Sequence, residues 1–323
     1  EAMLEAWQGC GDYLVGNLSY DLAAELEELG DAPPPDFPSM FFFRGSPVSA
    51  ATPKSQGFRA VVMAPKHDDF QHSVRRIVDA IHRGDIFQTN LCRTMEARVD
   101  SQSAWSVFQR MREVNPATHA AFLQLDQQRA ILSMSPESYL TVREGVVESR
   151  PIKGTRPRAA DAEELLKSEK DLAELAMIVD VVRNDLARVC VPGSVKVTQH
   201  AALMTLPTVL HLFSKVQGRL KGTLVDLLRA SFPAASISGA PKIEAMRIAL
   251  QEEGNLRGPC MGAIGWISFD GRMDLSVAIR TAYIDHGRLR YLAGGGITAS
   301  SDPSAEYEET VHKAKALLTA LGA

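Results

Sequence analysis

The 323-residue chain has few cysteines, and their scarcity excludes two kinds of architecture. The four cysteines lie far apart and form no Cys-x-x-Cys pair: Cys10, Cys92, Cys190 and Cys260. A disulfide framework and a structural zinc site both need closely patterned cysteines, so we expect neither. Unpaired cysteines are typical of a reducing compartment, and we expect a cytoplasmic protein.

The sequence also lacks a strong net charge and a long apolar run. Lysine and arginine number 35 against 39 acidic residues, which gives a net charge of −4 and no general attraction to nucleic acid or to anionic membranes. Any acidic ligand must therefore be held by local cations. We find no segment long enough to span a bilayer and no signal peptide, so we expect neither nucleic acid nor membrane as a partner.

The patterns that are present mix helices with hairpins. Helical spacing runs through residues 68–84, with Gly84 as its stop, and a long helix is predicted from its N-cap Asp161 to Cys190. The final third alternates as strands, including residues 273–284, around turns at 270–271 and 286–287. The chain ends in a helix with Asp302 as N-cap and Pro303 at its first position. This mixture predicts an α+β fold rather than a doubly wound sheet.

The first 65 residues are less regular than the rest. Residues 30–40 form a proline-dense connector, residues 46–57 are another loose stretch, and regular patterning begins after Lys66. We expect residues 1–65 to be the remnant of an N-terminal region packed on the same fold, and residues 66–323 to form the main domain. Because the chain opens within patterned sequence, we also expect that its natural start is missing.

The stretch SRPIKGTRPR, residues 149–158, places a lysine between an isoleucine and a glycine on a strand that leaves a hairpin. The hairpin turns at Glu144-Gly145. Counting alternate residues from Val147 puts Lys153 and Thr155 on one face of this strand. Propensity alone favours a solvated lysine at a strand end, before a turn glycine.

Several carboxylates stand where a charge is unexpected. On the long helix, Glu174 lies opposite the face of Leu172 and Ala176 in an apolar segment, which indicates an interior position, although it could equally be the last solvated residue before that segment. Glu137 follows an apolar run at a Ser-Pro turn, where turn chemistry is the ordinary explanation. Glu306, Glu309 and Lys313 form one stripe of the last helix, a pattern more typical of a solvated face.

Glu174 and Glu309 together could bind a hard cation through oxygen atoms. Carboxylates without histidine or cysteine suit Mg²⁺, which commonly uses one or two protein carboxylates together with ligand oxygens and water. Sequence patterns alone do not show whether the two helices that carry these residues lie close together.

From about Asp68 to Leu318 the chain resembles the chorismate-utilising enzymes, which include anthranilate, aminodeoxychorismate, isochorismate and salicylate synthases. The matching runs are long and occur in order: GDIFQTNL, SPESYL, PIKGT, MIVDVVRNDLARV, PGSVKV, SGAPKIEAMRI, GAIGWI, MDLSVAIRT and AGGGITASSDPSAEYEET. The resemblance implies two large antiparallel sheets packed together with helices outside, and an Mg²⁺-dependent site for chorismate. Residues 66–323 would then be the chorismate-binding catalytic domain.

Two positions bear on the reaction within this family. Members that make anthranilate, isochorismate or salicylate resemble one another in carrying alanine where this chain has Lys153, whereas aminodeoxychorismate synthases carry lysine. Members that use water as nucleophile carry a lysine base at the position of Gln88. Water needs a base to become a nucleophile and ammonia does not, so both positions indicate amination.

The resemblance also implies catalytic roles. Lys153 is expected to attack C2 of chorismate, and Glu137 is expected to protonate the departing 4-hydroxyl, for which it needs a raised pKa. Ammonia would then attack C4 and expel the lysine, giving 4-amino-4-deoxychorismate, a precursor of 4-aminobenzoate and folate.

The remaining site residues are also implied by matching positions. Glu174 and Glu309 match the metal ligands, with Glu306 and Asp171 as supporting acids. Arg280 matches a residue that pairs the enolpyruvyl carboxylate. Further substrate contacts are expected at Gly154, Thr155, His211, Gly294 and Lys313. Leu175 and Cys260 depart from the family, which often has histidine and tyrosine there.

Two alternatives remain open at this point. The chain could be an anthranilate synthase component, which also eliminates pyruvate, or a catalytically silent homologue that only binds. None of the four cysteines lies in a setting that would activate it, so ammonia is expected to come from a separate glutaminase subunit.

Overall fold

The computed structural model describes residues 13–322, apart from 28, 30–33, 36, 46–56, 64–66, 101–102 and 206–208. Cys10 lies outside the described residues. The described chain forms two compact units. Unit 1 comprises residues 13–14, 137–236 and 266–275, and unit 2 comprises residues 15–136, 237–265 and 276–322. The predicted division at residue 65 stays a prediction.

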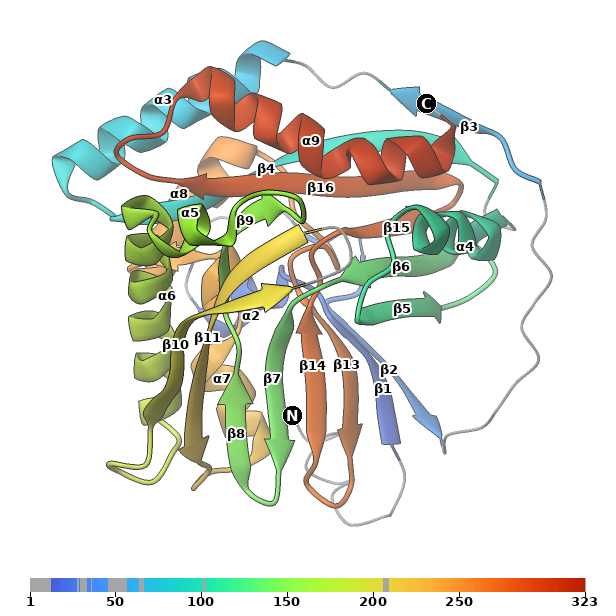
Figure 1. Ribbon diagram of the computed structural model, residues 1–323. Coiled ribbons are helices and arrows are strands. Elements are labelled where there is room, and N and C mark those ends of the chain that lie inside the picture. Colours follow the sequence, from blue (N-terminus) through green and yellow to red (C-terminus); the bar gives the residue numbers. More distant parts are fainter. Residues whose placement is uncertain are drawn as a thin grey trace. The chain divides into compact units, whose positions relative to one another are not determined.

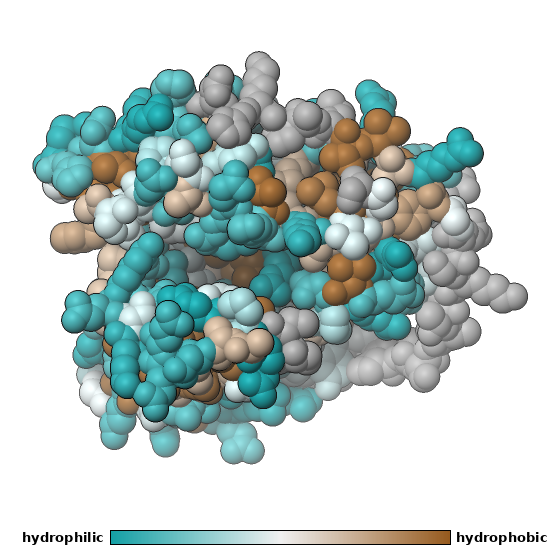
Figure 2. Space-filling model, turned by 45° about the horizontal axis from the view of Figure 1, so that its top comes forward, coloured by the Kyte–Doolittle hydropathy of each residue, from teal (hydrophilic) through white to brown (hydrophobic). Residues whose placement is uncertain are grey.

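Within the described residues, the strands form two large antiparallel sheets, of nine and seven strands, and the fold is α+β (Figure 1). The predicted fold class is confirmed in these respects. Most of the face shown in Figure 2 is hydrophilic, with hydrophobic residues in small groups. Among the described helices, none has the length and apolar character needed to cross a membrane.

Unit 1 contains most of the nine-stranded sheet, in the order β10-β11-β8-β7-β14-β13, and β9 also pairs with β11. The strands are β7 (Ser138–Arg143), β8 (Val146–Ser149), β9 (Ile152–Pro157), β10 (Lys196–Thr205), β11 (Val209–Arg219), β13 (Ala263–Ser268) and β14 (Met273–Val277), the last two shared with unit 2. The predicted hairpin turn between β7 and β8 is confirmed, because Glu144 and Gly145 both have positive φ, at 51° and 72°. The other strands of this sheet are β1 (Tyr13–Leu18) and β2 (Met40–Gly45).

The long helix predicted from residue 161 is two helices, α5 (Ala162–Leu166) and α6 (Glu169–Ala187). Asp161 caps the first, as predicted, by accepting a hydrogen bond from the Glu163 amide. Ser168 starts the second helix because its hydroxyl accepts from the amide of Asp171. One extended residue with a cap therefore separates helices that read as continuous in the sequence. A third helix of this unit is α7 (Leu224–Ser231).

Unit 2 contains the seven-stranded sheet, in the order β12-β4-β16-β15-β6-β5, with β3 also paired to β4. Its strands are β3 (Ala60–Met63), β4 (Gln88–Val99), β5 (His119–Gln124), β6 (Arg129–Ser135), β12 (Gly239–Ala240), β15 (Thr281–Asp285) and β16 (Arg288–Ile297). The predicted strand over 273–284 is wrong: Arg280, at φ 51°, separates β14 from β15, which belong to different sheets.

Helices pack on this sheet through apolar side chains. They are α3 (His67–Arg83), α4 (Ala104–Val114), α8 (Lys242–Glu253) and α9 (Pro303–Leu321), and the unit also contains the short helix α2 (Leu22–Leu26). In Figure 1, α9 runs along β16, which it contacts, and α3 and α4 also contact α9. The predicted ends are confirmed: Gly84 follows α3 in left-handed conformation, and Asp302 caps α9 by accepting from the amides of Ser304 and Ala305.

Candidate active site

The first group of predicted site residues lies in unit 1, around an irregularity of β9. Lys153 pairs with Leu212 of β11 and Thr155 pairs with His211, so Gly154 is an extra residue without a partner. This is a β-bulge, and it interrupts the alternation of side chains. Because Leu212 and His211 are neighbours on β11, they face opposite sides of the sheet. The prediction that Lys153 and Thr155 share a face is therefore wrong.

Glycine is required at the bulge for two reasons. Gly154 has φ 73°, in the region that favours glycine. A Cβ atom there would lie 3.0 Å from the Leu165 side chain and 3.1 Å from that of Asp171. The bulge thus lets the helices α5 and α6 approach β9 closely.

Lys153 lies beside Glu174, which α6 presents. The Lys153 Nζ atom is 4.0 Å from the Glu174 Oε2 atom, and the two side chains are only 12% and 17% exposed. Glu174 is thus neither solvated nor fully buried. The predicted nucleophile and a predicted metal ligand are close together within one unit.

Glu137 lies between β6 and β7 and is almost completely buried. Burial raises its pKa to about 7, and this effect exceeds those of the Ser236 hydroxyl, the Lys153 charge and a backbone hydrogen bond from Ile152, which all lower the pKa. A carboxyl group with this pKa is partly protonated at neutral pH. It can therefore donate a proton, as a general acid must.

Three other predicted residues of unit 1 have polar partners in the structure. The Thr155 hydroxyl and His211 Nδ1 are 2.9 Å apart, and His211 is buried. Asp171 accepts a hydrogen bond of 2.9 Å from Arg156 Nη2. The predicted supporting role of Asp171 at a metal stays a prediction, and the partner seen here is an arginine.

The second group lies in unit 2, where α9 meets the glycine-rich end of β16. A Cβ atom at Gly295 would lie 3.2 Å from Glu306 Oε2 and 3.5 Å from Glu309 Oε1. Both carboxylates therefore converge on the same short piece of main chain. Glu306 is buried and accepts a hydrogen bond of 2.6 Å from Ser301.

Lys313 connects these carboxylates with β16. Its Nζ atom lies 2.6 Å from Glu309 Oε1 and donates to the carbonyl of Gly294 at 2.7 Å. A side chain at Gly294 would collide with the main chain of Leu91 and would approach the Cys92 sulfur within 2.7 Å. Close packing therefore requires glycine at Gly294 and Gly295. The sequence pattern alone could not show whether these glycines mark close packing or a bulge.

Arg280 stands at the break between β14 and β15. Its carbonyl accepts a hydrogen bond from the Met134 amide, which holds the unusual backbone conformation. Burial lowers the pKa of its guanidinium, against an opposing effect of Tyr291. Because an arginine stays protonated in proteins, this side chain carries a largely desolvated positive charge that an anion would stabilise.

The donor atoms of Glu306 and Glu309 suit a magnesium ion. They are hard carboxylate oxygens, and the absent side chain at Gly295 leaves the space in front of both. The described residues contain no group of three or more histidine, cysteine or acidic side chains that could hold a metal by themselves. A small protein ligand set fits an ion that also uses substrate oxygens and water.

Three groups that act on the carboxylates of the site could not be predicted from the sequence. Ser236, Ser301 and the amide of Ile152 act on site carboxylates, but they are ordinary residues in ordinary segments. At the two family departures, Leu175 is a core residue, and the buried thiol of Cys260 donates to the carbonyl of Thr281. Gln88, at the position of the family's lysine base, is buried in β4.

Residues 46–319 match the family model for chorismate binding enzymes, which covers most of the chain. The chain belongs to this family. It is 41% identical over 282 residues to aminodeoxychorismate synthase component 1 of Klebsiella aerogenes, which covers 84% of the chain and 61% of that protein. It is 42% identical over 264 residues to anthranilate synthase component 1 of Saccharolobus solfataricus, covering 79% of the chain and 62% of that protein.

A solved structure agrees in fold. Anthranilate synthase component I from Streptococcus pneumoniae superposes with a TM-score of 0.85 at 30% identity, and the match covers 96% of this chain and 81% of that one. The chain thus spans about three fifths of the length of the two curated relatives. Relatives with two different activities are about equally similar, so overall identity does not separate them.

Proposed function

We propose that the protein is the chorismate-aminating component of an aminodeoxychorismate synthase, acting through a covalent adduct on Lys153. The observation that supports this most is the pairing of a nucleophile with an acid in unit 1. Lys153 lies close enough to Glu137 for its charge to lower the pKa of that carboxyl, yet burial still raises it to about 7. A neutral amine beside a protonated carboxyl is what the first step needs.

In that step the neutral Lys153 nitrogen bonds to C2 of chorismate, both ring double bonds shift by one position, and the bond from C4 to its hydroxyl breaks. Glu137 donates its proton to the departing hydroxyl, which leaves as water. The amine loses a proton, which restores charge balance. Ammonia then bonds to C4 and gives up a proton, both ring double bonds shift back, and the Lys153 nitrogen takes up a proton as its bond to C2 breaks, so that it leaves as an amine.

The other residues are assigned to binding. Arg280, desolvated and positively charged, is suited to a carboxylate of the substrate, and Lys313 to the ring carboxylate. Thr155 and His211 supply a hydroxyl and an imidazole held together at 2.9 Å. Glu174, Glu306 and Glu309 would hold Mg²⁺, which when bound supplies positive charge that stabilises the ring carboxylate and the charge that develops on the ring.

The main alternative is an anthranilate synthase component, which relatives at similar identity support. The two reactions are distinguished by their products, because anthranilate formation releases pyruvate. Purified protein should be given chorismate, Mg²⁺ and ammonium salt, with products identified by mass spectrometry. We expect 4-amino-4-deoxychorismate without pyruvate. Anthranilate with stoichiometric pyruvate would establish the alternative, and no turnover would favour a binding homologue.

The proposal includes a separate glutaminase partner, as the name component 1 of the relatives suggests. The three cysteines within the described residues are buried, and burial raises the pKa of each thiol: Cys92 (to about 12), Cys190 and Cys260. A glutaminase needs a readily formed thiolate. The chain alone should use ammonium salts, better as free ammonia accumulates at higher pH. Sustained glutamate release from glutamine without a partner would contradict this.

A further inference from the structure

Unit 2 contains a buried ion pair, Arg257 with Glu253, to which the proposed reaction gives no role. The two side chains are only 3% and 5% exposed, and Arg257 Nη2 lies 2.7 Å from Glu253 Oε1. A second hydrogen bond of 2.9 Å joins Arg257 Nε to Glu253 Oε2, so the pair is bidentate. Both charges lose their hydration on burial, and such a pair adds little net stability compared with apolar side chains. Stability alone therefore does not account for it.

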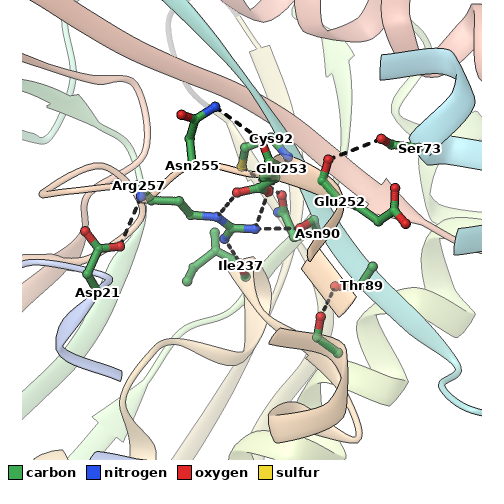
Figure 3. A network of polar contacts seen from close by, with 11 residues as sticks. Asp21, Ser73, Thr89, Asn90, Cys92, Ile237, Glu252, Glu253, Asn255 and Arg257 are labelled. Atoms are coloured by element: carbon green, nitrogen blue, oxygen red, sulfur yellow. Dashed lines mark hydrogen bonds and ion pairs between the residues drawn. The ribbon is translucent and has the colours of Figure 1, made fainter. Parts of the chain in front are cut away.

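Arg257 also fixes the main chain of two other segments. Its Nη1 atom donates to the carbonyl of Ile237, just before β12, at 3.1 Å, and its Nη2 atom donates to the carbonyl of Asn90 in β4 at 2.7 Å. The guanidinium carbon lies 4.2 Å from the centre of the Tyr20 ring. Figure 3 shows the guanidinium group at the centre of these hydrogen bonds. Three acceptor residues and one aromatic ring thus hold it in a single position.

Glu253 extends this network along β4. Its Oε1 atom accepts a hydrogen bond of 2.7 Å from the main-chain amide of Cys92. On this edge of β4, β12 pairs with residues 88–89 and β3 pairs with residues 96–99. The ion pair therefore binds residues 90–92 at a part of the edge that lies outside both short strands.

The other edge of residues 90–92 pairs with the glycine-rich end of β16. Cys92 is paired with Gly294, and Leu91 with Gly295. A Cβ atom at Gly294 would lie 2.4 Å from the Leu91 carbonyl oxygen and 2.7 Å from the Cys92 sulfur. Since protein interiors are close-packed and glycine has no side chain that could adapt, a shift of β4 is transmitted to this main chain.

The charged groups of the candidate site in unit 2 lie against the same main chain. Lys313 donates to the carbonyl of Gly294 at 2.7 Å. The carboxylates of Glu306 and Glu309 lie 3.2 Å and 3.5 Å from the position that a Cβ atom at Gly295 would take. A continuous series of contacts therefore runs from the buried ion pair, through β4 and β16, to these three side chains.

We propose that Arg257 is a positioning residue of the candidate site. It acts through Glu253 and β4, and it holds the glycine-rich main chain of β16 at the depth at which Glu309 and Lys313 can bind Mg²⁺ and chorismate. The inference rests on the proposed function, which assigns these two ligands to unit 2. Lysine cannot replace Arg257 in this role, because a single ammonium group lacks the fixed fork of donors of a guanidinium group.

Arg257→Lys tests the inference, because it keeps the positive charge and loses the fork. We expect the variant to bind Mg²⁺ about tenfold more weakly in calorimetry, and its KM for chorismate to rise by a similar factor. The turnover number should change less, since Lys153 and Glu137 lie in unit 1. All measurements are made at a temperature at which circular dichroism shows the variant to be folded.

The matched control is Arg76→Lys. Arg76 binds Glu252, the residue before Glu253 at the end of α8, but the Arg76 side chain is 58% exposed. This variant should keep the wild-type affinity for Mg²⁺ and the wild-type KM, because an exposed pair contributes little. Glu253→Gln is a second variant for the case that Arg257→Lys does not fold. It keeps the shape of the side chain and removes its charge, and it should weaken the binding of both ligands.

A folded Arg257→Lys variant with a lowered melting temperature, but with wild-type Mg²⁺ affinity and KM, would overturn the inference, because Arg257 would then serve only the stability of the fold. An equal loss in Arg76→Lys would overturn it as well. The proposed function fails in a different way: the wild-type protein would then bind neither Mg²⁺ nor chorismate. If the wild type binds both and the variants match it, only the role of Arg257 is wrong.

Discussion

The two groups of candidate residues differ in how far their charged side chains are exposed to water. In unit 1, Glu137 is buried deeply enough that its pKa rises to about 7, and the mostly buried Lys153 and Glu174 lie 4.0 Å apart. In unit 2, Glu309 and Lys313 are about half exposed and are paired with each other at 2.6 Å. Desolvation changes the proton affinity of a buried group, whereas the charges of an exposed pair are screened by water. The difference suits unit 1 to bond and proton chemistry and unit 2 to holding ions and carboxylates.

The largest effect is expected when the proposed nucleophile of unit 1 is removed. We expect Lys153→Ala to lose aminodeoxychorismate formation by several orders of magnitude while the fold is kept, because only the covalent route is lost. Initial rates with chorismate and ammonium salt, together with circular dichroism, provide the measurement. Lys167→Ala, on an exposed lysine of the same unit, is the control and should be fully active. Full activity of Lys153→Ala would show that Lys153 is not the nucleophile.

The next largest effect is expected when a proposed magnesium ligand is removed. Glu309→Ala should abolish the response of activity to Mg²⁺, since it removes one of few anionic ligands, and Glu174→Ala should do the same. Titration of activity and of magnesium binding by calorimetry checks this. The matched control is Glu308→Ala, on the neighbouring exposed residue of α9. If Glu309→Ala bound Mg²⁺ as the wild type does, the ligand assignment would be wrong.

Glu137→Gln separates proton donation from binding. Turnover should fall about 10²- to 10⁴-fold with little change in substrate affinity, because a proton donor is lost and a ligand is not. If the variant lost metal affinity while Glu174→Ala kept it, the two roles would have to be exchanged. In the wild type, activity measured at a constant concentration of free ammonia should fall as the pH rises through about 7, because the acid form of Glu137 is lost.

Glu137→Gln should lower turnover, but it should raise the stability of the folded protein at high pH. The native pKa of Glu137 lies above its ordinary value of 4.5, so ionisation destabilises the folded state, and the wild type loses stability as the pH rises from about 4.5 to 7. A shift of this size corresponds to about 3 kcal/mol. Glu137→Gln should therefore be more stable than the wild type at pH 8, and the difference should disappear toward pH 4. Denaturant unfolding at the two pH values measures it.

The smallest effect is expected at the ion pair of Asp171 with Arg156. The pair is partly exposed, so Arg156→Gln should lower the free energy of unfolding by no more than about 1 kcal/mol and leave turnover nearly unchanged. Urea unfolding and steady-state rates measure this. A large loss of turnover would place Asp171 in the catalytic machinery rather than beside it.

The sequence predicted features that depend on local chemistry. Asp302 and Gly84 mark helix ends because capping and left-handed backbone are properties of single residues, and both predictions are confirmed. The break at Ser168 and the positive φ of Arg280 were missed, because neither residue is rare in the element it interrupts. The bulge at Gly154 was missed for a related reason: it depends on pairing with a strand more than fifty residues away.

The site could be predicted only in part for physical reasons as well. The identities of Lys153, Glu137 and the glutamates came from motifs. The pKa of Glu137 is set by burial that several distant segments produce, and the convergence of Glu306 and Glu309 depends on close packing at Gly295.

The most direct test of the central claim is the mass of the protein during turnover. Wild-type protein is mixed with chorismate and Mg²⁺ with ammonium withheld, so that the second step cannot occur, and is then digested and mapped. The account predicts a peptide containing Lys153 that is heavier by chorismate less one water, absent from Lys153→Ala and discharged when ammonium is added. Formation of aminodeoxychorismate at the full rate with no adduct on Lys153 would contradict it.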